Sequence, residues 1–240
     1  MAGENYLNLT RNKRQNLKST NLLNKEILSP SIPTLSPTDT VNQALELMGT
    51  YHLSHLPVVE QDKYLGLALE DDLLNINGED LLINSVQHMS KVAVQAGTHF
   101  LEAVQAVNDY DLSVVPVLER DGLYLGMITG ADLLIHLGKI TGASVPGAVI
   151  VLELEKQNFS FSEVSKLVET NDAHITQLNT YWDDQNEAFF VTIKINKFEV
   201  SDIIATFQRY EYQVKYYFGE ELYENELRSN YDNLINYLNI

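Results

Sequence analysis

The sequence contains no cysteine, which excludes disulfide bonds, a thiolate nucleophile and thiolate metal ligands. No apolar run approaches the roughly 18 residues that a membrane-spanning helix needs. Residues 1–20 have no apolar centre, so they do not resemble a secretory signal. Together these absences favour a cytoplasmic protein with no part in a membrane.

Sequence motifs that carry catalysis are also missing. The histidines show none of the HxH, HxxxH or HExxH spacings that are typical of metal sites. There is no GxSxG, GxxxxGK[ST] or GxGxxG, and no credible acid–base pair of carboxylates. We therefore expect no enzyme, no metal site and no required cofactor.

Basic residues are scarce, since 16 Lys and Arg stand against 33 Asp and Glu. The formal net charge is −17, although residues 1–27 hold more basic than acidic residues. A body this acidic repels nucleic acids and anionic membranes, so we expect neither as a partner. Residues 1–27 are predicted to be a flexible basic N-terminal extension.

One pattern is present twice, as HLSHLPVVEQDKYLGLALEDDLL over residues 52–74 and DLSVVPVLERDGLYLGMITGADLL over residues 111–134. Each copy is too small to bury a good core alone, so two copies are expected to pack face to face. The cleft between them is the first place to expect a ligand.

Apolar spacing predicts the same order of elements in both copies, a helix, two strands and a second helix. Asp39 or Thr40 is a plausible N-cap for the first helix. The expected ranges are a helix over 41–48, strands over 56–59 and 64–69 and a helix from 72, then a helix over 100–107, strands over 114–118 and 123–128 and a helix from 130.

Beyond Gly142 the pattern changes to the order β-α-β-β-α-β, which is typical of a ferredoxin-like unit. The fold class is therefore α/β and α+β. The expected ranges are strands over 147–155, 174–182, 188–195 and 212–218 and helices over 161–168 and 200–207, followed by a C-terminal helix over 221–240.

The strongest chemical signal is Thr129 with Asp132, where an apolar strand ends and a helix begins. A carboxylate there can bind the vicinal hydroxyls of a ribose, and the free backbone N–H groups of the first turn can hold a phosphate. The alternative is purely structural, with Thr129 as N-cap and Asp132 as the acid of a capping box. The first copy has Leu69 in place of Thr129, followed by two further acids, so its site should be weak or empty for a polyphosphate.

Few cations or polar groups accompany this pair. His136 and Lys139 follow Asp132 on about the same helix face and could contact an anion, although a solvated helix face is the alternative. His55 stands where the second copy has Val114, and it could face the cleft or be a satisfied core histidine.

The two copies resemble cystathionine β-synthase (CBS) motifs, through LSHLPVV at 53–59, LSVVPVL at 112–118 and GMITGAD at 126–132. The resemblance implies a pseudo-twofold pair (a Bateman module) with motifs at 28–84 and 85–143. It also implies a homodimer and an adenosyl ligand such as AMP, ATP or S-adenosylmethionine. By the same resemblance, Thr129 and Asp132 hold ribose and phosphate, Asp72 is the retained acid of the first site, and the adenine is bordered by Val92, Val94, Val115, Pro116 and Val117.

Residues 146–220 resemble an ACT domain by the order of their elements, with Lys156–Phe159 where that family has Asp-x-Pro-Gly. The whole layout is similar to acetoin-utilisation regulatory proteins. We expect a non-catalytic regulator that binds an adenosyl ligand mainly at the second site and acts on an unknown protein partner. A ligand-free dimeric scaffold and amino-acid sensing through the ACT-like domain stay open as alternatives.

Overall fold

The computed structural model describes residues 22–30, 32–76, 78, 80–86, 89–185 and 187–219. The chain divides into two compact units, Met1–Leu137 and Gly138–Ile240. The predicted C-terminal helix and most of the predicted N-terminal extension lie outside the described residues.

The first copy of the repeat begins with a well-capped helix. Thr40 is the N-cap, because its hydroxyl accepts the Gln43 N–H at 3.2 Å and its own N–H donates to the Gln43 side chain at 2.9 Å. The elements of this copy are η1 (Asn24–Glu26), α2 (Val41–Tyr51), β1 (His55–Glu60), β2 (Lys63–Leu69), α3 (Glu70–Leu74) and η2 (Ile83–Ser85).

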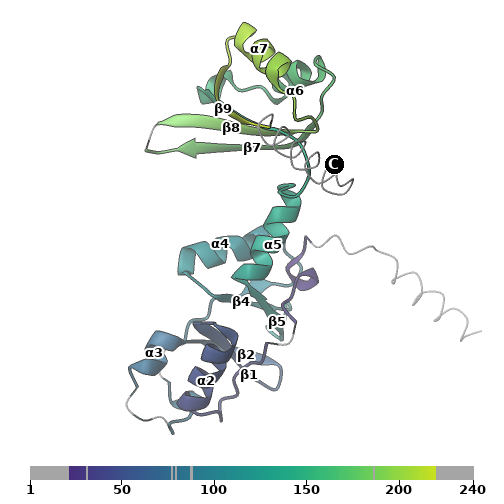
Figure 1. Cartoon of the computed structure of the whole chain (residues 1–240). Helices are drawn as coiled ribbons and strands as arrows, with labels where there is room; N and C mark the ends of the chain where they lie inside the picture. Colours follow the sequence, from purple (N-terminus) through teal and green to yellow (C-terminus); the bar gives the residue numbers. More distant parts are fainter. Residues whose placement is uncertain are drawn as a thin grey trace, which may run out of the picture. The chain divides into compact units, whose positions relative to one another are not determined.

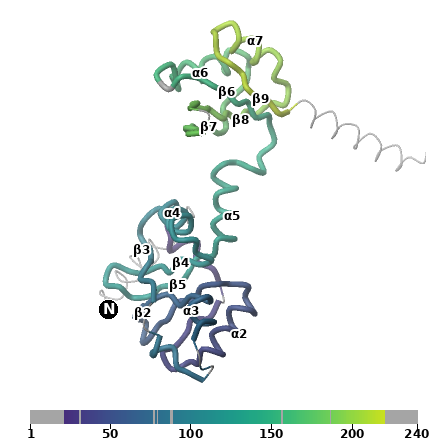
Figure 2. The backbone as a smooth tube through the Cα atoms, turned by 90° about the vertical axis from the view of Figure 1, so that its left-hand side faces the viewer, coloured from purple at the N-terminus to yellow at the C-terminus, as the bar shows by residue number. Residues whose placement is uncertain are grey.

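The second copy repeats the order helix, strand, strand, helix, as predicted (Figures 1 and 2). Both strand pairs are antiparallel, and β3 adds a parallel strand beside β4. In the first copy a single parallel bridge, Leu35 to Val58, stands where Val94 pairs with Val117. The elements are β3 (Val94–Gln95), α4 (Leu101–Tyr110), β4 (Val114–Leu118), β5 (Tyr124–Thr129) and α5 (Gly130–Ile140).

The leading segment of each copy crosses to the other copy. The Ser29 N–H donates to the Met127 carbonyl of β5 at 2.8 Å. In the matching place, the Leu67 N–H of β2 donates to the Ser90 carbonyl at 2.8 Å. The two copies therefore interlock through backbone hydrogen bonds and do not merely touch.

The glycine that both copies share lies under these crossings. Gly66 has φ +154°, and a Cβ atom built on it would be 2.6 Å from the Cβ of Met89. A Cβ on Gly126 would be 3.1 Å from a terminal carbon of Leu28. The glycines thus let the other copy's segment pass close to the strand.

Residues 22–27, which were expected to belong to the flexible extension, are instead packed in the structure. Asn24 is fully buried, and its side-chain amide donates to the Gln95 carbonyl at 2.9 Å and the Thr98 hydroxyl at 3.0 Å. Leu23 forms a β-bridge with His99. Residues 22–27 are therefore part of the first unit, where they pack on the second copy.

The second unit has the predicted β-α-β-β-α-β order. Its antiparallel sheet has the strand order β7-β8-β6-β9, which confirms the ferredoxin-like topology. Figure 1 shows α6 and α7 on the same side of this sheet. The elements are β6 (Val149–Leu154), η3 (Lys156–Asn158), α6 (Phe161–Glu169), β7 (Ile175–Asp183), β8 (Ala188–Ile195), α7 (Ser201–Arg209) and β9 (Gln213–Phe218).

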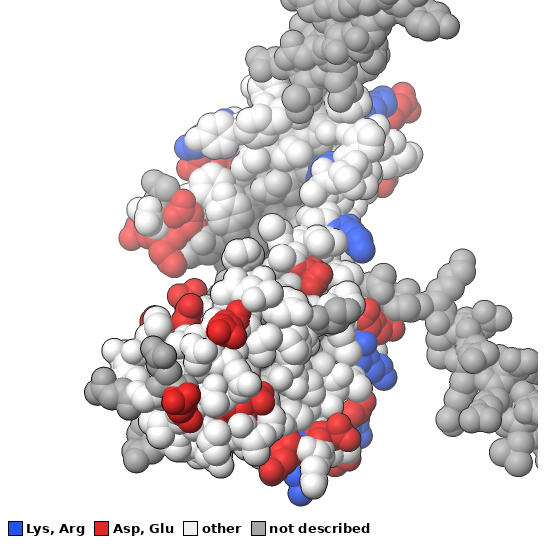
Figure 3. Space-filling model, turned by 60° about the horizontal axis from the view of Figure 1, so that its bottom comes forward, with Lys and Arg blue, Asp and Glu red and all other residues white. Residues whose placement is uncertain are grey.

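Alternation along the strands places the core of this unit between sheet and helices. Ile150, Val191 and Ile193 of the sheet are fully buried, as are Val164 of α6 and Phe207 of α7. Within the part of the chain that the structure describes, no helix is both long and apolar enough to cross a membrane. Acidic side chains are spread over the face shown in Figure 3, with Lys and Arg between them.

Candidate functional site

The turn from β5 into α5 brings the two predicted site residues together. Thr129 ends the strand, and its hydroxyl accepts the Asp132 N–H at 3.1 Å. The same hydroxyl donates to Asp132 Oδ2 at 2.7 Å. The structure thus contains the N-cap half of the structural alternative, whereas the Thr129 N–H, which the acid of a capping box would accept, donates to Ser29 instead.

Ser29 completes this cluster, and sequence reasoning missed it. Its hydroxyl accepts the Thr129 N–H at 2.9 Å and donates to Asp132 Oδ2. An ionised carboxylate has about four acceptor positions, so two hydroxyl donors on one oxygen leave room for a ligand hydroxyl. Capping and ligand binding by Asp132 are therefore compatible.

The corresponding turn of the first copy is built differently. Leu69 precedes α3 without a side-chain cap, and α3 has 5 residues against 11 in α5. Asp72 is exposed, and with Glu70 and Asp71 it places three acidic residues in the first turn. Acids at a helix N-terminus stabilise the helix but repel an anionic ligand. The two turns therefore differ in local structure, and the difference in ligand affinity stays a prediction.

The residues predicted to border an adenine fall into two groups. Val115, Pro116 and Val117 are buried in β4. Val92 and Val94 line a groove of about 470 Å³ against α4, and neither Thr129 nor Asp132 lines that groove. The carbonyl of Val92 already accepts a hydrogen bond at 3.0 Å from the Tyr64 hydroxyl of the first copy. Its backbone therefore serves the contact between the two copies.

His55 is a satisfied core histidine, the structural one of its two alternatives. It is 7% exposed, and its Nδ1 accepts the Ser113 N–H at 3.2 Å. The hydroxyls of Ser54 and Ser113 lie 3.1 Å from the same nitrogen. Burial lowers the pKa of His55, against the opposing effect of Asp111, Asp71 and Glu70. The imidazole of His55 is therefore neutral, and its hydrogen bonds connect the two copies of the repeat.

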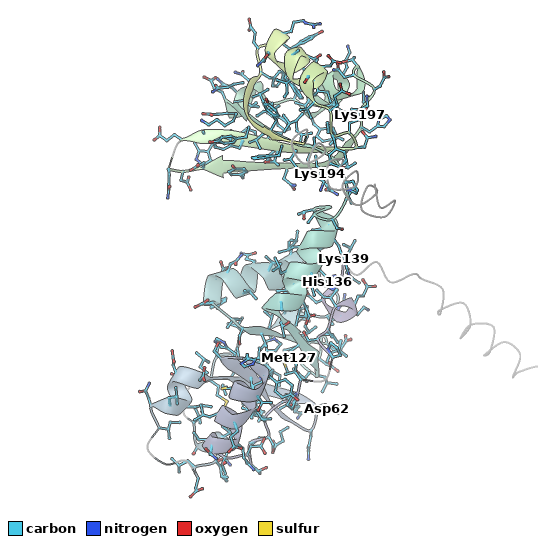
Figure 4. The ribbon with its side chains drawn as sticks, viewed as in Figure 1. Asp62, Met127, His136, Lys139, Lys194 and Lys197 are labelled. Carbon is cyan, nitrogen blue, oxygen red and sulfur yellow. The ribbon has the colours of Figure 1, made fainter. Side chains whose placement is uncertain are left out.

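His136 and Lys139 occupy successive turns of α5 (Figure 4). The ring of His136 is half-buried, with its centroid 6.2 Å from that of the fully buried Phe100. Lys139 is exposed in the last turn of the helix. His136 thus packs against α4, and the solvated-face alternative describes Lys139.

Two further hollows lie in the second unit, with volumes of about 760 and 500 Å³. Both are lined by Glu153, Leu154, Glu155 and Gln213, so the carboxylate of an amino acid would meet acidic side chains there. In the described ranges, no group of three or more His, Cys, Asp or Glu side chains is placed to hold a metal ion.

Known proteins match this chain in the region of the repeat. The family model of the CBS domain matches residues 25–78 and 83–139. An inosine-5'-monophosphate dehydrogenase of Methanocaldococcus jannaschii is 28% identical over 110 residues, which are 45% of this chain and 22% of that protein. A CBS domain-containing protein of Dictyostelium discoideum is 27% identical over 135 residues, 50% of this chain and 93% of that protein. Because the chain matches about a fifth of the dehydrogenase, catalytic activity does not carry over to it.

Solved structures give matches of similar extent. A CBS domain pair/ACT domain protein of Thermotoga maritima is 18% identical with a TM-score of 0.45, and the match covers 49% of this chain and 98% of that one. CBSX2 of Arabidopsis thaliana, solved in complex with AMP, is 18% identical with a TM-score of 0.43 and covers 50% and 98%. The family match and the repeated order of elements show that the chain contains a tandem pair of CBS domains.

Proposed function

We propose that the CBS pair binds an adenosyl ligand, such as AMP, ATP or S-adenosylmethionine, at the turn between β5 and α5. The observation that carries the proposal is the cluster of Thr129, Asp132 and Ser29, which only the second copy has in the described residues. The protein then acts as a non-catalytic cytoplasmic regulator with one competent site.

The chemistry of the cluster suits a nucleoside. The Asp132 carboxylate can accept hydrogen bonds from the two ribose hydroxyls, which lie on neighbouring carbons. A phosphate can use the N–H groups in the first turn of α5, an 11-residue helix, where the dipole favours negative charge. The first copy presents three carboxylates instead, so the two sites should differ widely in affinity.

Isothermal titration with the three ligands tests the proposal. Combining Thr129→Val with Asp132→Asn removes the hydroxyl and the charge that the ligand would use, and Asp72→Asn is the matched change in the first copy. Each lost charge-assisted hydrogen bond costs about 2 kcal/mol, or roughly thirtyfold in Kd. Since Thr129 also caps α5, circular dichroism must show that the variant is folded. Absence of heat with all three ligands on folded protein, or equal losses in both variants, would refute the proposal.

Exposed apolar side chains on the helices of the pair support the homodimer. Leu134 and Ile135 of α5 are 70% and 56% exposed, and Leu74 of α3 is 63% exposed. Exposed apolar clusters of this kind commonly mark protein interfaces. A ligand can regulate such a dimer only by binding one arrangement more tightly than another. The identity of the second unit as an ACT domain, and of the chain as an acetoin-type regulator, belongs to the same proposal.

A further inference from the structure

The sheet of the second unit has one face that its helices do not cover. Ile150 and Val191 point into the helix-covered core, so their neighbours Val149, Val151 and Phe190 face the other way. Strand pairing adds aromatic partners to this side, with Phe218 opposite Val149, Tyr216 opposite Val151 and Tyr181 opposite Phe190. We call these six residues the open face.

Aromatic side chains dominate the open face, and three of the four are poorly covered, whereas Phe190 is 6% exposed. Tyr181, Tyr216 and Phe218 are 51%, 54% and 57% exposed. The rings of Tyr181 and Phe190 stack with centroids 5.2 Å apart, which gives the face a flat apolar surface. An apolar surface of this kind on a folded domain normally has an occupant.

The chain itself leads to this face. Phe218 is the last strand residue that the structure describes, and a Cβ on the following Gly219 would be 2.6 Å from the Cβ of Ala148. The backbone therefore leaves β9 tightly packed beside the start of β6, next to the row formed by Val149 and Phe218. Another 21 residues, 220–240, follow from this corner.

The sequence of residues 220–240 carries a matching apolar stripe. Its members are spaced by three or four residues and fall within about 80° of a helix surface, at 100° per residue. They are Tyr223, Leu227, Tyr231, Leu234 and Leu238. A helix of this length is about 30 Å long. A sheet of four strands spaced about 4.8 Å apart is less than about 20 Å wide. The segment is thus long enough to cross the open face.

We propose that residues 220–240 form an amphipathic helix whose apolar stripe covers the open face of the same chain. The linker before β6 already reaches one edge of this face, where the Lys194 ammonium, opposite Val149, donates to the Gly142 carbonyl at 2.5 Å. This proposal concerns the second unit and is independent of any ligand at the CBS pair.

Thiol reactivity in the full-length chain tests the proposal, because the protein has no cysteine of its own. Thr192→Cys places a thiol on β8, opposite Val151 on the open face, and Ser162→Cys places one at an exposed position of α6. The thiol on β8 should react with a maleimide about tenfold more slowly than the thiol on α6, since it becomes accessible only when the helix opens.

Charges on the stripe should remove this protection. Leu227→Asp with Leu234→Asp should raise the reaction rate of the β8 thiol to that of the α6 thiol. The matched pair Asn225→Asp with Asn236→Asp adds the same charges on the opposite side of the helix and should leave the rate low. Equal rates at both thiols in the parent chain would overturn the proposal, as would protection that survives the stripe substitutions. In the second case, a rate that depends on protein concentration identifies a second copy as the occupant.

Hydrogen exchange on the unsubstituted chain gives a measurement that requires no variant to fold. Backbone amides of residues 223–238 should exchange about tenfold or more slowly than an unstructured chain. Exchange at the unstructured rate would show that no helix covers the open face.

Discussion

Exchange of Gly66 for alanine tests the interlock between the two copies. The new methyl group would be 2.6 Å from the Cβ of Met89 and 3.2 Å from the Ser90 carbonyl oxygen, so the crossing segment must move. That movement breaks the 2.8 Å hydrogen bond from Leu67 to Ser90, worth about 1 kcal/mol. The backbone conformation at φ +154° costs a further 1–3 kcal/mol or so for any residue with a Cβ. We expect the free energy of unfolding to fall by about 2–4 kcal/mol.

Gly126→Ala is the matched control in the second copy. Its methyl group would meet the terminal carbons of Leu28 at 3.1 and 3.2 Å, and a leucine side chain can move aside for about 1 kcal/mol or less. Urea denaturation followed by far-ultraviolet circular dichroism measures both variants, and the fluorescence of Trp182 reports separately on the second unit. Equal losses in the two variants, or a loss below about 1 kcal/mol for Gly66→Ala, would refute the proposed role of the crossing segment.

Three further predictions test other parts of the first unit. Burial lowers the pKa of His55, so its neutral form adds stability that is complete above the free-histidine pKa of about 6.5 and is lost as the pH falls through the lower folded pKa. Unfolding free energies measured between pH 5 and 8 (roughly the histidine range) should therefore decrease on acidification, and His55→Val should flatten that slope. Ser29→Ala leaves the Thr129 N–H without its acceptor and should cost about 1–2 kcal/mol in urea denaturation, whereas Ser29→Thr, which keeps the hydroxyl, should cost less than half of that. Leu134→Asp with Ile135→Asp should shift a dimer to monomer in sedimentation, and an unchanged sedimentation coefficient would exclude α5 from the interface.

Periodicity in the sequence was sufficient to predict most elements of both units. Strand 114–118 and strand 188–195 were predicted with the bounds that the structure has. Short-range sequence patterns predict such helices and strands, because strand alternation and the 3.6-residue helical repeat depend only on residues that are close in the sequence. The same is true of the Thr40 cap, which needs only Gln43, three residues away.

The features that were not predicted depend on contacts between residues that are far apart in the sequence. Ser29 and Asp132 are hydrogen-bonded although they are 103 positions apart in the sequence, and no local sequence pattern predicts such a contact. The role of His55 stayed open in the sequence because its partner Ser113 is 58 positions away. The hydrogen bond from Tyr64 of the other copy to the carbonyl of Val92, 28 positions away, was likewise not predicted. Site residues in a repeat are therefore least predictable where the copies contact each other.

The interlock has a consequence for how the protein is made. During synthesis, Ser29 leaves the ribosome about a hundred residues before Asp132, its hydrogen-bonding partner. At about 5–20 residues per second, the leading segment waits some 5–20 seconds for the strand on which it rests. Throughout that interval the first CBS domain lacks the second half of its interlock, so it is a candidate client for chaperones until the second domain has emerged.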